Sequence, residues 1–280
     1  MLEVMINYFI KSYKRKMARR ITKKYPFRID SFDIDGVGEI KFANWENPLI
    51  ERKEISIDNI DFFRKFLSEG DFAIDIGSNI GLMTTEMAIV NGKKGLTLAF
   101  DPNPFVYEVL LENIKLNPEK TNMAAHNVAI TDKEEEFYYN SSEASFGNGG
   151  LSLTNESKHG KYTLSTKVKG VVLEALLKRE YADYIPKLKL IKIDTEVYDK
   201  EVIKSISNLL KQYKPALISE VYEHNKPEEK FEQFEVIKSL GYSVFYFSDF
   251  TSNAEIVEIK VKEDMLKWRH FDIYAIPQGK

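Results

Sequence analysis

The segment FAIDIGSNIGLMTTEMA, Phe72–Ala88, contains an apolar strand, a glycine-marked turn and the start of a helix within seventeen residues. Gly77 and Gly81 bracket the turn, and Asn79 lies between them. Glycine permits positive φ angles and close backbone approach, and the first turn of a helix presents unpaired N–H groups. The turn therefore predicts a ligand site. It is a poor match to a dinucleotide-binding turn, because it reads G-x-N-x-G where that pattern reads G-x-G-x-x-G.

Strand and helix patterns alternate along the rest of the chain. We expect further strands over residues 95–100, 122–130, 188–194, 216–222, 242–247 and 270–276, and helices over 80–90, 104–116, 200–213 and 228–240. Alternation of this kind predicts an α/β fold with parallel strand pairing and helices on both faces of the sheet. In such sheets ligands bind at the carboxyl ends of the strands, where the strand order reverses. The glycine turn follows a strand and is expected at that edge.

The composition limits the class of protein. At 280 residues, with 43% hydrophobic and 12% aromatic residues, the chain can bury the core of one large α/β domain or of two small ones. A formal net charge of −3 gives no overall attraction to nucleic acid or to an anionic membrane. The absence of cysteine excludes disulfides, thiolate nucleophiles and thiolate metal sites. No apolar run is long enough to span a bilayer and no secretory signal is recognisable, so we expect a cytoplasmic protein.

The N-terminal segment departs from this balance. Residues 1–24 carry eight Lys and Arg against the single acid Glu3, a net charge of about +7 that leaves about −10 for the rest of the chain. Apolar residues recur along the segment at helical spacing: Leu2, Ile6, Phe9, Tyr13 and Met17. Two interpretations of this basic amphipathic helix stay open. It packs on its own domain with solvated lysines outside, or it provides peripheral membrane contact or self-association.

Two aspartates follow neighbouring strands of the predicted sheet. Asp75 lies at the end of the first strand, and Asp101 ends the next one, about twenty residues past Gly81. An acid at the second position is suited to the two hydroxyls of a ribose. The turn and the acid together therefore favour a nucleoside ligand over a generic α/β turn.

Five sequence blocks, in this order, resemble the FkbM-type methyltransferases: DIGSNIG, AFDPNPFVYEVLLENIKLN, HNVAITD, LIKIDTEVYDKEVI and PALISE. The resemblance covers about residues 55–225, and its family-specific part is the K-I-D-x-E block followed by the P-x-x-I-x-E strand. It implies the Rossmann-like class I methyltransferase fold, with a mostly parallel, doubly wound sheet and a terminal antiparallel strand. On this basis we expect a basic helix and a short β extension over residues 1–54. A methyltransferase domain then covers 55–280, with a loop and β insertion at about 134–169.

The resemblance implies S-adenosylmethionine as the cofactor. The residues that it assigns to the methionine and ribose end are Asp75, Gly77, Ser78, Asn79 and Gly81. It makes Asp101 the acid that binds the ribose hydroxyls. Asn127, Val128 and Ala129 would flank the adenine.

Three carboxylates are the candidate catalytic residues. Asp194 and Glu196 follow the strand LKLIKID, and Glu220 ends the neighbouring strand ALISE, so all three are expected at the edge that carries the glycine turn. They could remove the proton of an acceptor hydroxyl or bind a divalent cation, and we prefer the first role and commit to no metal site. The alternative is that some of them cap loops or pair with Lys192.

Other features bear on the acceptor site. The chain has four histidines that could act as a base: His126, His159, His224 and His270. His126 lies in an apolar strand, so we expect a structural role for it. Val197 stands where the family usually has the glycine of D-x-E-G, which puts the shape of the acceptor pocket in doubt. We expect the segment 142–160 to form a lid, with Ser145, Asn148, Ser152 and His159 available to contact a polyol.

These observations predict an S-adenosylmethionine-dependent O-methyltransferase that modifies a hydroxyl of a saccharide, a glycoconjugate or a related natural product. A nucleic-acid substrate is disfavoured, because the folded body is acidic and the chain lacks an N/D-P-P-Y/F motif. Two alternatives remain. An NAD(P)-dependent Rossmann oxidoreductase would need the stricter glycine pattern and a Tyr-x-x-x-Lys motif after a Ser. A non-catalytic cofactor-fold protein for binding or assembly is kept open by Val197.

Overall fold

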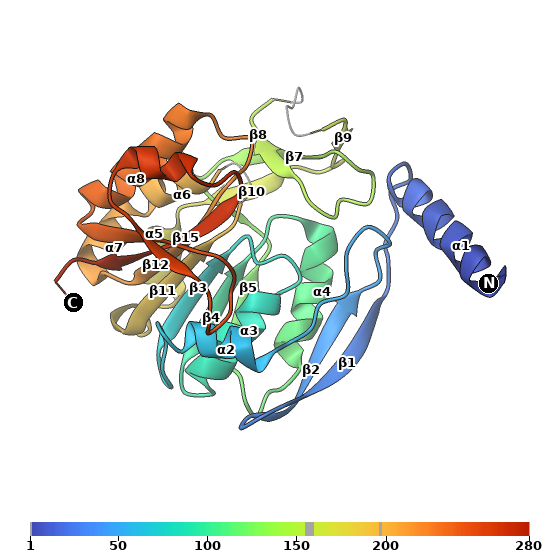
Figure 1. Ribbon diagram of the computed structural model, residues 1–280, viewed down its shortest axis with the longest axis horizontal. Coiled ribbons are helices and arrows are strands. Elements are labelled where there is room, and N and C mark those ends of the chain that lie inside the picture. The colour runs from blue at the N-terminus through green and yellow to red at the C-terminus, as the bar shows by residue number, and fades with distance from the viewer. Residues whose placement is uncertain (1, 155–159, 196–197, 280) are drawn as a thin grey trace.

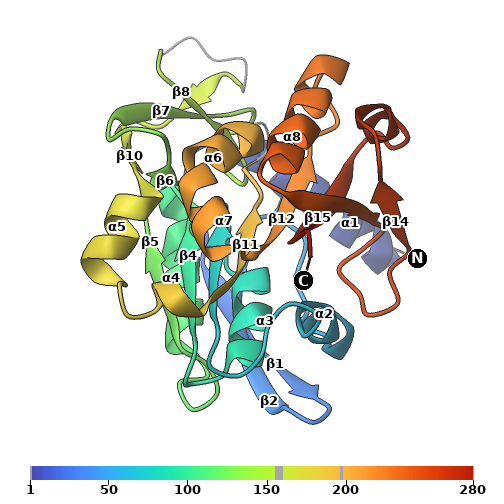
Figure 2. The same ribbon diagram turned by 90° about the vertical axis from the view of Figure 1, so that its left-hand side faces the viewer.

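The computed structural model describes residues 2–154, 160–195 and 198–279. Within these ranges the main sheet has eight strands in the order β14-β13-β15-β12-β11-β3-β4-β5 (Figures 1 and 2). The strands are β3 (Phe72–Ile76), β4 (Leu96–Phe100), β5 (Met123–His126), β11 (Leu188–Ile193), β12 (Ala216–Val221), β13 (Tyr242–Phe247), β14 (Ile256–Ile259) and β15 (Phe271–Pro277). Strands β5, β4, β3, β11 and β12 pair in parallel, and β15 runs antiparallel between β12 and β13. The expected mostly parallel, doubly wound sheet with a terminal antiparallel strand is confirmed, and β14 adds an antiparallel edge strand that we did not predict.

Helices cover both faces of this sheet. They are α2 (Ile57–Phe63), α3 (Leu82–Asn91), α4 (Pro104–Lys115), α5 (Leu173–Glu180), α6 (Asp199–Ser205), α7 (Ser207–Tyr213) and α8 (Pro227–Ser239), with the 3₁₀ helices η1 (Ile185–Lys187) and η2 (Lys262–Leu266). Successive residues of a strand point to opposite faces, so Ile74 and Ile76 join the core under α5–α8. Ala73 joins the core under α2 and α3, beside Phe63 and Met87. The strand order reverses between β3 and β11, which puts the carboxyl ends of these two strands at the expected ligand position.

Two expected elements are interrupted. The strand expected over 122–130 becomes β5 and a separate β6 (Ala129–Ile130), because β6 leaves the main sheet and pairs in parallel with β10 (Val168–Val171). The helix expected over 200–213 divides into α6 and α7 at Ile206. There the Ser205 hydroxyl donates to the Val202 carbonyl at 2.7 Å, a local bond of the kind that competes with helical hydrogen bonds.

The insertion forms a second, small sheet. Its strands are β6, β7 (Glu136–Ser141), β8 (Gly150–Ser152), β9 (Tyr162–Thr163) and β10. They pair in the order β6-β10-β7-β8, with β9 also on β7. Figures 1 and 2 both place β7 and β8 at one end of the main sheet. The insertion is therefore built onto the body through β6 and stands over one edge of it.

The N-terminal extension packs on α4 through side-chain amides. Strands β1 (Phe27–Ile34) and β2 (Gly38–Trp45) form an antiparallel hairpin beside α4 (Figure 1). Asn113 of α4 accepts a bond from the Ala43 N–H at 2.6 Å and donates to the Ala43 and Ile80 carbonyls at 3.1 and 2.7 Å. Asn117 pairs in the same way with the N–H and carbonyl of Lys41, each at 2.8 Å. One buried amide thus connects the hairpin to Ile80 of the glycine turn.

Helix α1 (Leu2–Ala18) lies apart from these layers (Figure 1). Its residues from 5 to 16 are exposed, so the structure does not show the packed arrangement that was one of our two interpretations. Over the described residues, no helix combines the length and the apolar character needed to cross a membrane.

Replacing Asn113 tests the connection between the hairpin and α4. Asn113→Leu leaves the buried Ala43 and Ile80 backbone groups without partners, so we expect the free energy of unfolding to fall by at least about 2 kcal/mol. Asn117→Gly is the control, because the bonds of Asn117 to Lys41 lie at the surface where water can replace them, and glycine tolerates the φ of 59° at this position. Urea unfolding of both variants measures the difference. Equal losses in the two variants would contradict the buried connection.

Candidate functional site

The glycine turn is pressed against the end of β11. Gly77, Asn79 and Gly81 all have positive φ angles, of 79°, 51° and 88°. The N–H groups of Gly77 and Ser78 donate to the Phe100 carbonyl of β4 at 2.9 and 3.0 Å. A Cβ atom on Gly77 would lie 1.8 Å from the Asp194 carbonyl oxygen. Only glycine can occupy this position, because both the backbone conformation and the space exclude a side chain.

Asp101 fastens the turn from the neighbouring strand. Its Oδ2 accepts a bond from the Asn79 N–H, and its Oδ1 accepts one from the Asn103 N–H, both at 2.8 Å. Burial raises the pKa of Asp101 to about 7, although these two N–H groups oppose the shift. Each carboxylate oxygen keeps a second lone pair, so Asp101 can accept further hydrogen bonds from a ligand.

Buried Lys192 of β11 connects two aspartates, Asp75 of β3 and Asp194, which directly follows β11. Lys192 Nζ lies 3.4 Å from Asp75 Oδ1 and 3.2 Å from Asp194 Oδ2. Burial opposes the charge on Lys192, but the Asp194 and Asp75 carboxylates outweigh it and raise the Lys192 pKa above its ordinary range. Asp75 also accepts a bond from the Thr84 hydroxyl of α3 at 2.6 Å. The site therefore holds one fixed positive charge between two carboxylates.

Asp199, at the start of α6, holds Thr195, which lies two residues after the end of β11. Its carboxylate accepts bonds from the N–H and hydroxyl of Thr195, at 3.0 and 2.7 Å. It also accepts bonds from the Ser219 hydroxyl and the Glu220 N–H, both at 3.2 Å. Burial and the nearby Asp194 raise the pKa of Asp199 to about 6. Asp199 thus ties Thr195 to β12.

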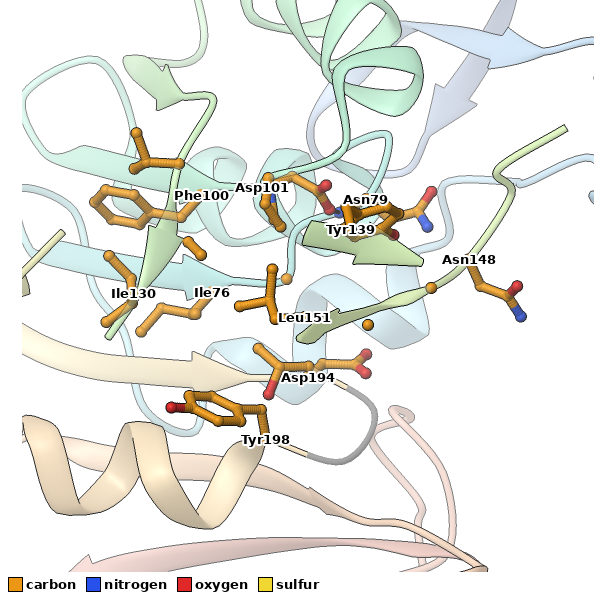
Figure 3. A pocket seen from close by; sticks show the side chains of 17 residues that line it. Ile76, Asn79, Phe100, Asp101, Ile130, Tyr139, Asn148, Leu151, Asp194 and Tyr198 are labelled. Carbon is orange, nitrogen blue, oxygen red and sulfur yellow. Dashed lines mark hydrogen bonds between the residues drawn. The ribbon is translucent and has the colours of Figure 1, made fainter. Parts of the chain in front are cut away.

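Two cavities lie on either side of the glycine turn and share Gly77, Asn79 and Asp194. The first, of about 180 Å³, is lined mainly by apolar side chains, and Figure 3 shows Ile76, Ile130 and Leu151 between Asp101 and Asp194. The second, of about 220 Å³, is also lined largely by apolar groups, from Ile50, Ile80, Leu82 and Met83. It differs in its four charged lining residues, Lys53, Asp75, Lys192 and Asp194, which are joined by Ser78. Neither cavity alone reaches the roughly 300 Å³ at which sites for drug-sized ligands begin, and the two together do.

The residues present fit an adenosyl cofactor that spans both cavities. The first cavity offers an apolar slot beside an acid, and the second offers charges of both signs. The hydroxyl of Ser78 is buried in the second cavity, and among the described residues it has no hydrogen-bond partner. A buried polar atom without a partner is costly, so a ligand group at this position would satisfy it.

Most of the residues expected to hold the cofactor line one of the cavities. Those in the linings are Asp75, Gly77, Ser78, Asn79, Asp101, Val128 and Ala129. Gly81 and Asn127 lie outside both linings. Gly81 is the N-cap of α3, where a Cβ would lie 2.6 Å from Leu110 Cδ1. The Asn127 side-chain amide donates to the main-chain carbonyl of Asp101 at 2.8 Å. Asn127 therefore supports the backbone beside the cavity and does not line the cavity itself.

The three expected catalytic carboxylates have different surroundings. Asp194 lines both cavities, and its side chain is 42% exposed. Glu196, with the neighbouring Val197, lies outside the described residues. Glu220 lies outside both linings and contacts His270, with 3.1 Å between its Oε1 and the imidazole Nε2. Since β15 is antiparallel to β12, His270 lies just before β15 at the edge where β12 ends.

The other histidines have separate roles or positions. His126 stacks on Phe100, its Nε2 lies 2.8 Å from the Tyr181 hydroxyl, and burial lowers its pKa, which supports the structural role expected for it. His224 is exposed and pairs with Glu223 at 3.4 Å. His159 lies outside the described residues.

The insertion contributes one wall of the first cavity. Asn148, Gly149, Gly150 and Leu151 line it, together with Tyr139 of β7. Ser145 is buried and bonds to Glu143 at 3.4 Å, and Ser152 bonds to the Thr154 carbonyl at 2.7 Å. These two serines bond within the insertion and lie outside the cavity lining, whereas Asn148 lines the cavity.

Sequence reasoning missed Lys53 and Asp199. The backbone of Lys53 is held by Asn44 of β2, whose amide accepts from the Lys53 N–H at 2.7 Å and donates to its carbonyl at 2.9 Å. No local pattern marks Lys53, because it precedes the alternating region. Over the described residues, no group of three or more His, Asp or Glu side chains is arranged to hold a metal ion.

Comparisons with known proteins find similarity to methyltransferases. The model of the Methyltransferase FkbM domain matches residues 75–247 of the chain. A search of curated proteins finds no significant match. Similar solved structures include the methyltransferase FkbM from Methylobacillus flagellatus KT, which is 10% identical with a TM-score of 0.45 over 77% of this chain and 50% of that one. A precorrin-6y C5,15-methyltransferase from Geobacter metallireducens GS-15 is 13% identical, with a TM-score of 0.44 over 85% of this chain and 93% of that one. A SAM-dependent O-methyltransferase from Thermotoga maritima is 12% identical, with a TM-score of 0.43 over 91% and 79%.

Gly77→Ala tests the close approach of the turn to β11. Gly241→Ala is the matched control, because Gly241 has a similar φ of 83° but no atom within 4 Å of a Cβ. We expect the control to lose about 1–2 kcal/mol from backbone strain alone. The Gly77 variant adds a collision with the Asp194 carbonyl and loses clearly more. Thermal unfolding measures both, and a Gly77 variant as stable as the control would refute the contact.

Proposed function

This chain belongs to the FkbM methyltransferase family, and we propose that it methylates a hydroxyl of a saccharide, a glycoconjugate or a related natural product with S-adenosylmethionine. The observation that carries this proposal is the position of Asp194. Among the described residues it is the one carboxylate that lines both cavities, and its side chain is partly exposed. A donor that spans the cavities and an acceptor that arrives from solvent can both reach it.

The first cavity supports binding of the adenosine part of the cofactor. Phe100, Val128 and Ile130 provide flat apolar surface for adenine. Asp101 lies in the same lining and has lone pairs left for the two ribose hydroxyls. The aspartate therefore has two roles in the proposal: it shapes the glycine turn and it orients the ribose.

The second cavity supports binding of the methionine part. Asp75 and Asp194 offer carboxylates for an ammonium group, and Lys53 and the Ser78 hydroxyl offer donors for a carboxylate. Lys192 keeps the two aspartates apart and neutralises one of their charges. The lining thus matches the two opposite charges of an amino acid end.

When bound, S-adenosylmethionine supplies a methyl group on a sulfonium, which is already an activated electrophile. The tasks left to the protein are to orient the acceptor hydroxyl and to accept its proton. Asp194 is placed to accept that proton or to bind the hydroxyl. Glu220 and His270 form a second candidate pair at the same sheet edge, in which the imidazole accepts the proton and the carboxylate orients the ring.

A polyol acceptor is supported by the mixed lining of the first cavity. Asn148, Thr195 and Tyr198 carry hydrogen-bonding groups beside the apolar slot. Sugar rings present hydroxyls at their rims and apolar C–H faces, which suits such a surface. The oxidoreductase alternative has no equivalent support, because the family model that matches is that of a methyltransferase.

The pKa of Asp101 predicts a pH dependence of cofactor binding. Ribose hydroxyls donate to the ionised carboxylate, and with a pKa raised to about 7 this form is lost as the pH falls below 7. We therefore expect the affinity for S-adenosylhomocysteine, measured by calorimetry, to be about tenfold weaker at pH 6 than at pH 8. Asp101→Asn should bind weakly and show no such slope.

Asp272→Asn is the matched control for this experiment. Burial and the Asp194 carboxylate also raise the pKa of Asp272 to about 7, but Asp272 lies outside both cavity linings. The control should therefore keep the wild-type slope. A wild-type profile that is flat between pH 6 and pH 8 would remove Asp101 from the ribose site.

Transfer of a labelled methyl group to a panel of glycans and glycolipids tests the proposed reaction. Asp194→Asn should lower kcat, measured at saturating S-adenosylmethionine, by about 10²–10⁴ if Asp194 accepts the proton. The affinity for S-adenosylhomocysteine should also fall, because Asp194 is one of the two carboxylates offered to the ammonium group. Asp183→Asn, an exposed aspartate before β11, should behave like the wild type. Cofactor binding without transfer to any hydroxyl acceptor would instead favour the non-catalytic alternative.

A further inference from the structure

Helix α1 exposes a continuous set of large apolar side chains. Six of them are between 47% and 69% exposed: Met5, Ile6, Tyr8, Phe9, Ile10 and Tyr13. The helix projects from the body in Figure 1, and the three main cores of the body contain none of these residues. Exposed apolar patches of this kind on a folded protein mark an interaction surface.

Four apolar residues of α1 share one face of the helix, and basic residues lie opposite that face and along its flanks. Ile6, Phe9, Ile10 and Tyr13 follow the i, i+3, i+4, i+7 spacing of a single face. At 100° per residue, Lys11 and Arg15 fall on the opposite side, together with Tyr8. Lys14 lies at the flank of the apolar face and Lys16 lies beside Phe9, and all four basic residues are exposed. A charged face opposite an aromatic and aliphatic face is the pattern of helices that lie in a membrane interface.

The basic side continues into a groove between α1 and the hairpin. This groove has a volume of about 680 Å³, and four cations line it: Lys11, Lys14, Arg15 and Lys23. Tyr13 and Tyr25 also line it, and the Lys23 ammonium lies 4.8 Å from the centre of the Tyr25 ring. Glu46 is its one acidic lining residue among those described. The groove therefore offers donors for an anionic headgroup directly beside the apolar face.

We propose that residues 2–24 bind the surface of a bilayer that contains anionic phospholipids, with α1 lying along the interface. Charge complementarity selects this occupant. The segment 1–24 carries about +7 and the remaining chain about −10, so an anionic surface attracts the segment and repels the body. A second copy of the chain is a poorer partner, because two segments of about +7 would repel one another across the shared face.

Vesicle sedimentation with the full chain tests this proposal. We expect the chain to sediment with vesicles of phosphatidylcholine and phosphatidylserine at least about tenfold more strongly than with phosphatidylcholine alone. Binding should weaken between 0.1 and 0.5 M salt, because salt screens the attraction. Equal binding of the chain to both kinds of vesicle, or binding to neither, would overturn the proposal.

Two variants separate the contributions of charge and apolar surface. The double variant Lys11→Glu and Lys14→Glu, and the double variant Phe9→Ser and Ile10→Ser, should each reduce binding at least about tenfold. Lys169→Glu with Lys211→Glu is the matched control, because both lysines are exposed and lie on the body. It changes the net charge by the same amount and should bind like the wild type.

All variants are expected to fold, because the altered side chains of α1 lie outside the cores of the body, and circular dichroism with S-adenosylhomocysteine calorimetry checks this. If the control loses as much vesicle binding as the α1 variants, net charge alone explains the binding. That result would overturn the assignment to α1. Analytical ultracentrifugation without lipid provides the last outcome. If the chain forms a dimer that dissociates on substitution of Phe9 and Ile10, and if it does not bind vesicles, the apolar face of α1 binds a second copy of the chain instead.

Discussion

The contact between Gly77 and the Asp194 carbonyl is the constraint on which the site depends. It brings the ends of β3 and β11 together where the strand order reverses, with 1.8 Å between a hypothetical Cβ and the carbonyl oxygen. Because the backbones meet there, the turn divides the edge of the sheet into two cavities instead of one. Asp101 maintains the arrangement from β4 by holding the Asn79 N–H. Two adjoining cavities suit an elongated ligand, and they exist because Gly77 has no side chain where it meets the Asp194 carbonyl.

Buried charge is the second organising feature, and it is balanced in pairs. Lys192 lies between Asp75 and Asp194, and because Asp75 and Lys192 are both buried, removing Asp75 costs about 3–5 kcal/mol. Asp199 instead receives four hydrogen bonds from Thr195 and from β12, which offset the cost of burying its carboxylate. Similar aspartates thus serve different purposes. One group provides fixed charges that face the cavities, and the other fastens the backbone that carries them.

Local patterns in the sequence predict most of the fold and the cofactor half of the site. The strand pattern and the glycine turn locate β3, and Asp101 follows from its distance along the chain, because all these signals lie within about thirty residues of one another. Lys53 could not be predicted in this way, since only the packing of the hairpin on Asn113 brings it to the cavity. The pairing of Glu220 with His270 depends on β15 lying next to β12, across fifty residues of chain, and no local periodicity encodes that order.

The position of β15 has a consequence for how the chain folds. It follows β12, β13 and β14 in sequence, yet it pairs between β12 and β13. During synthesis those two strands therefore emerge with unsatisfied edges and cannot meet until residues 271–277 are added. Pairings between such distant segments form slowly, and unpaired strand edges invite association with other chains in the meantime. The main sheet can therefore be completed only after residues 271–277 have been made.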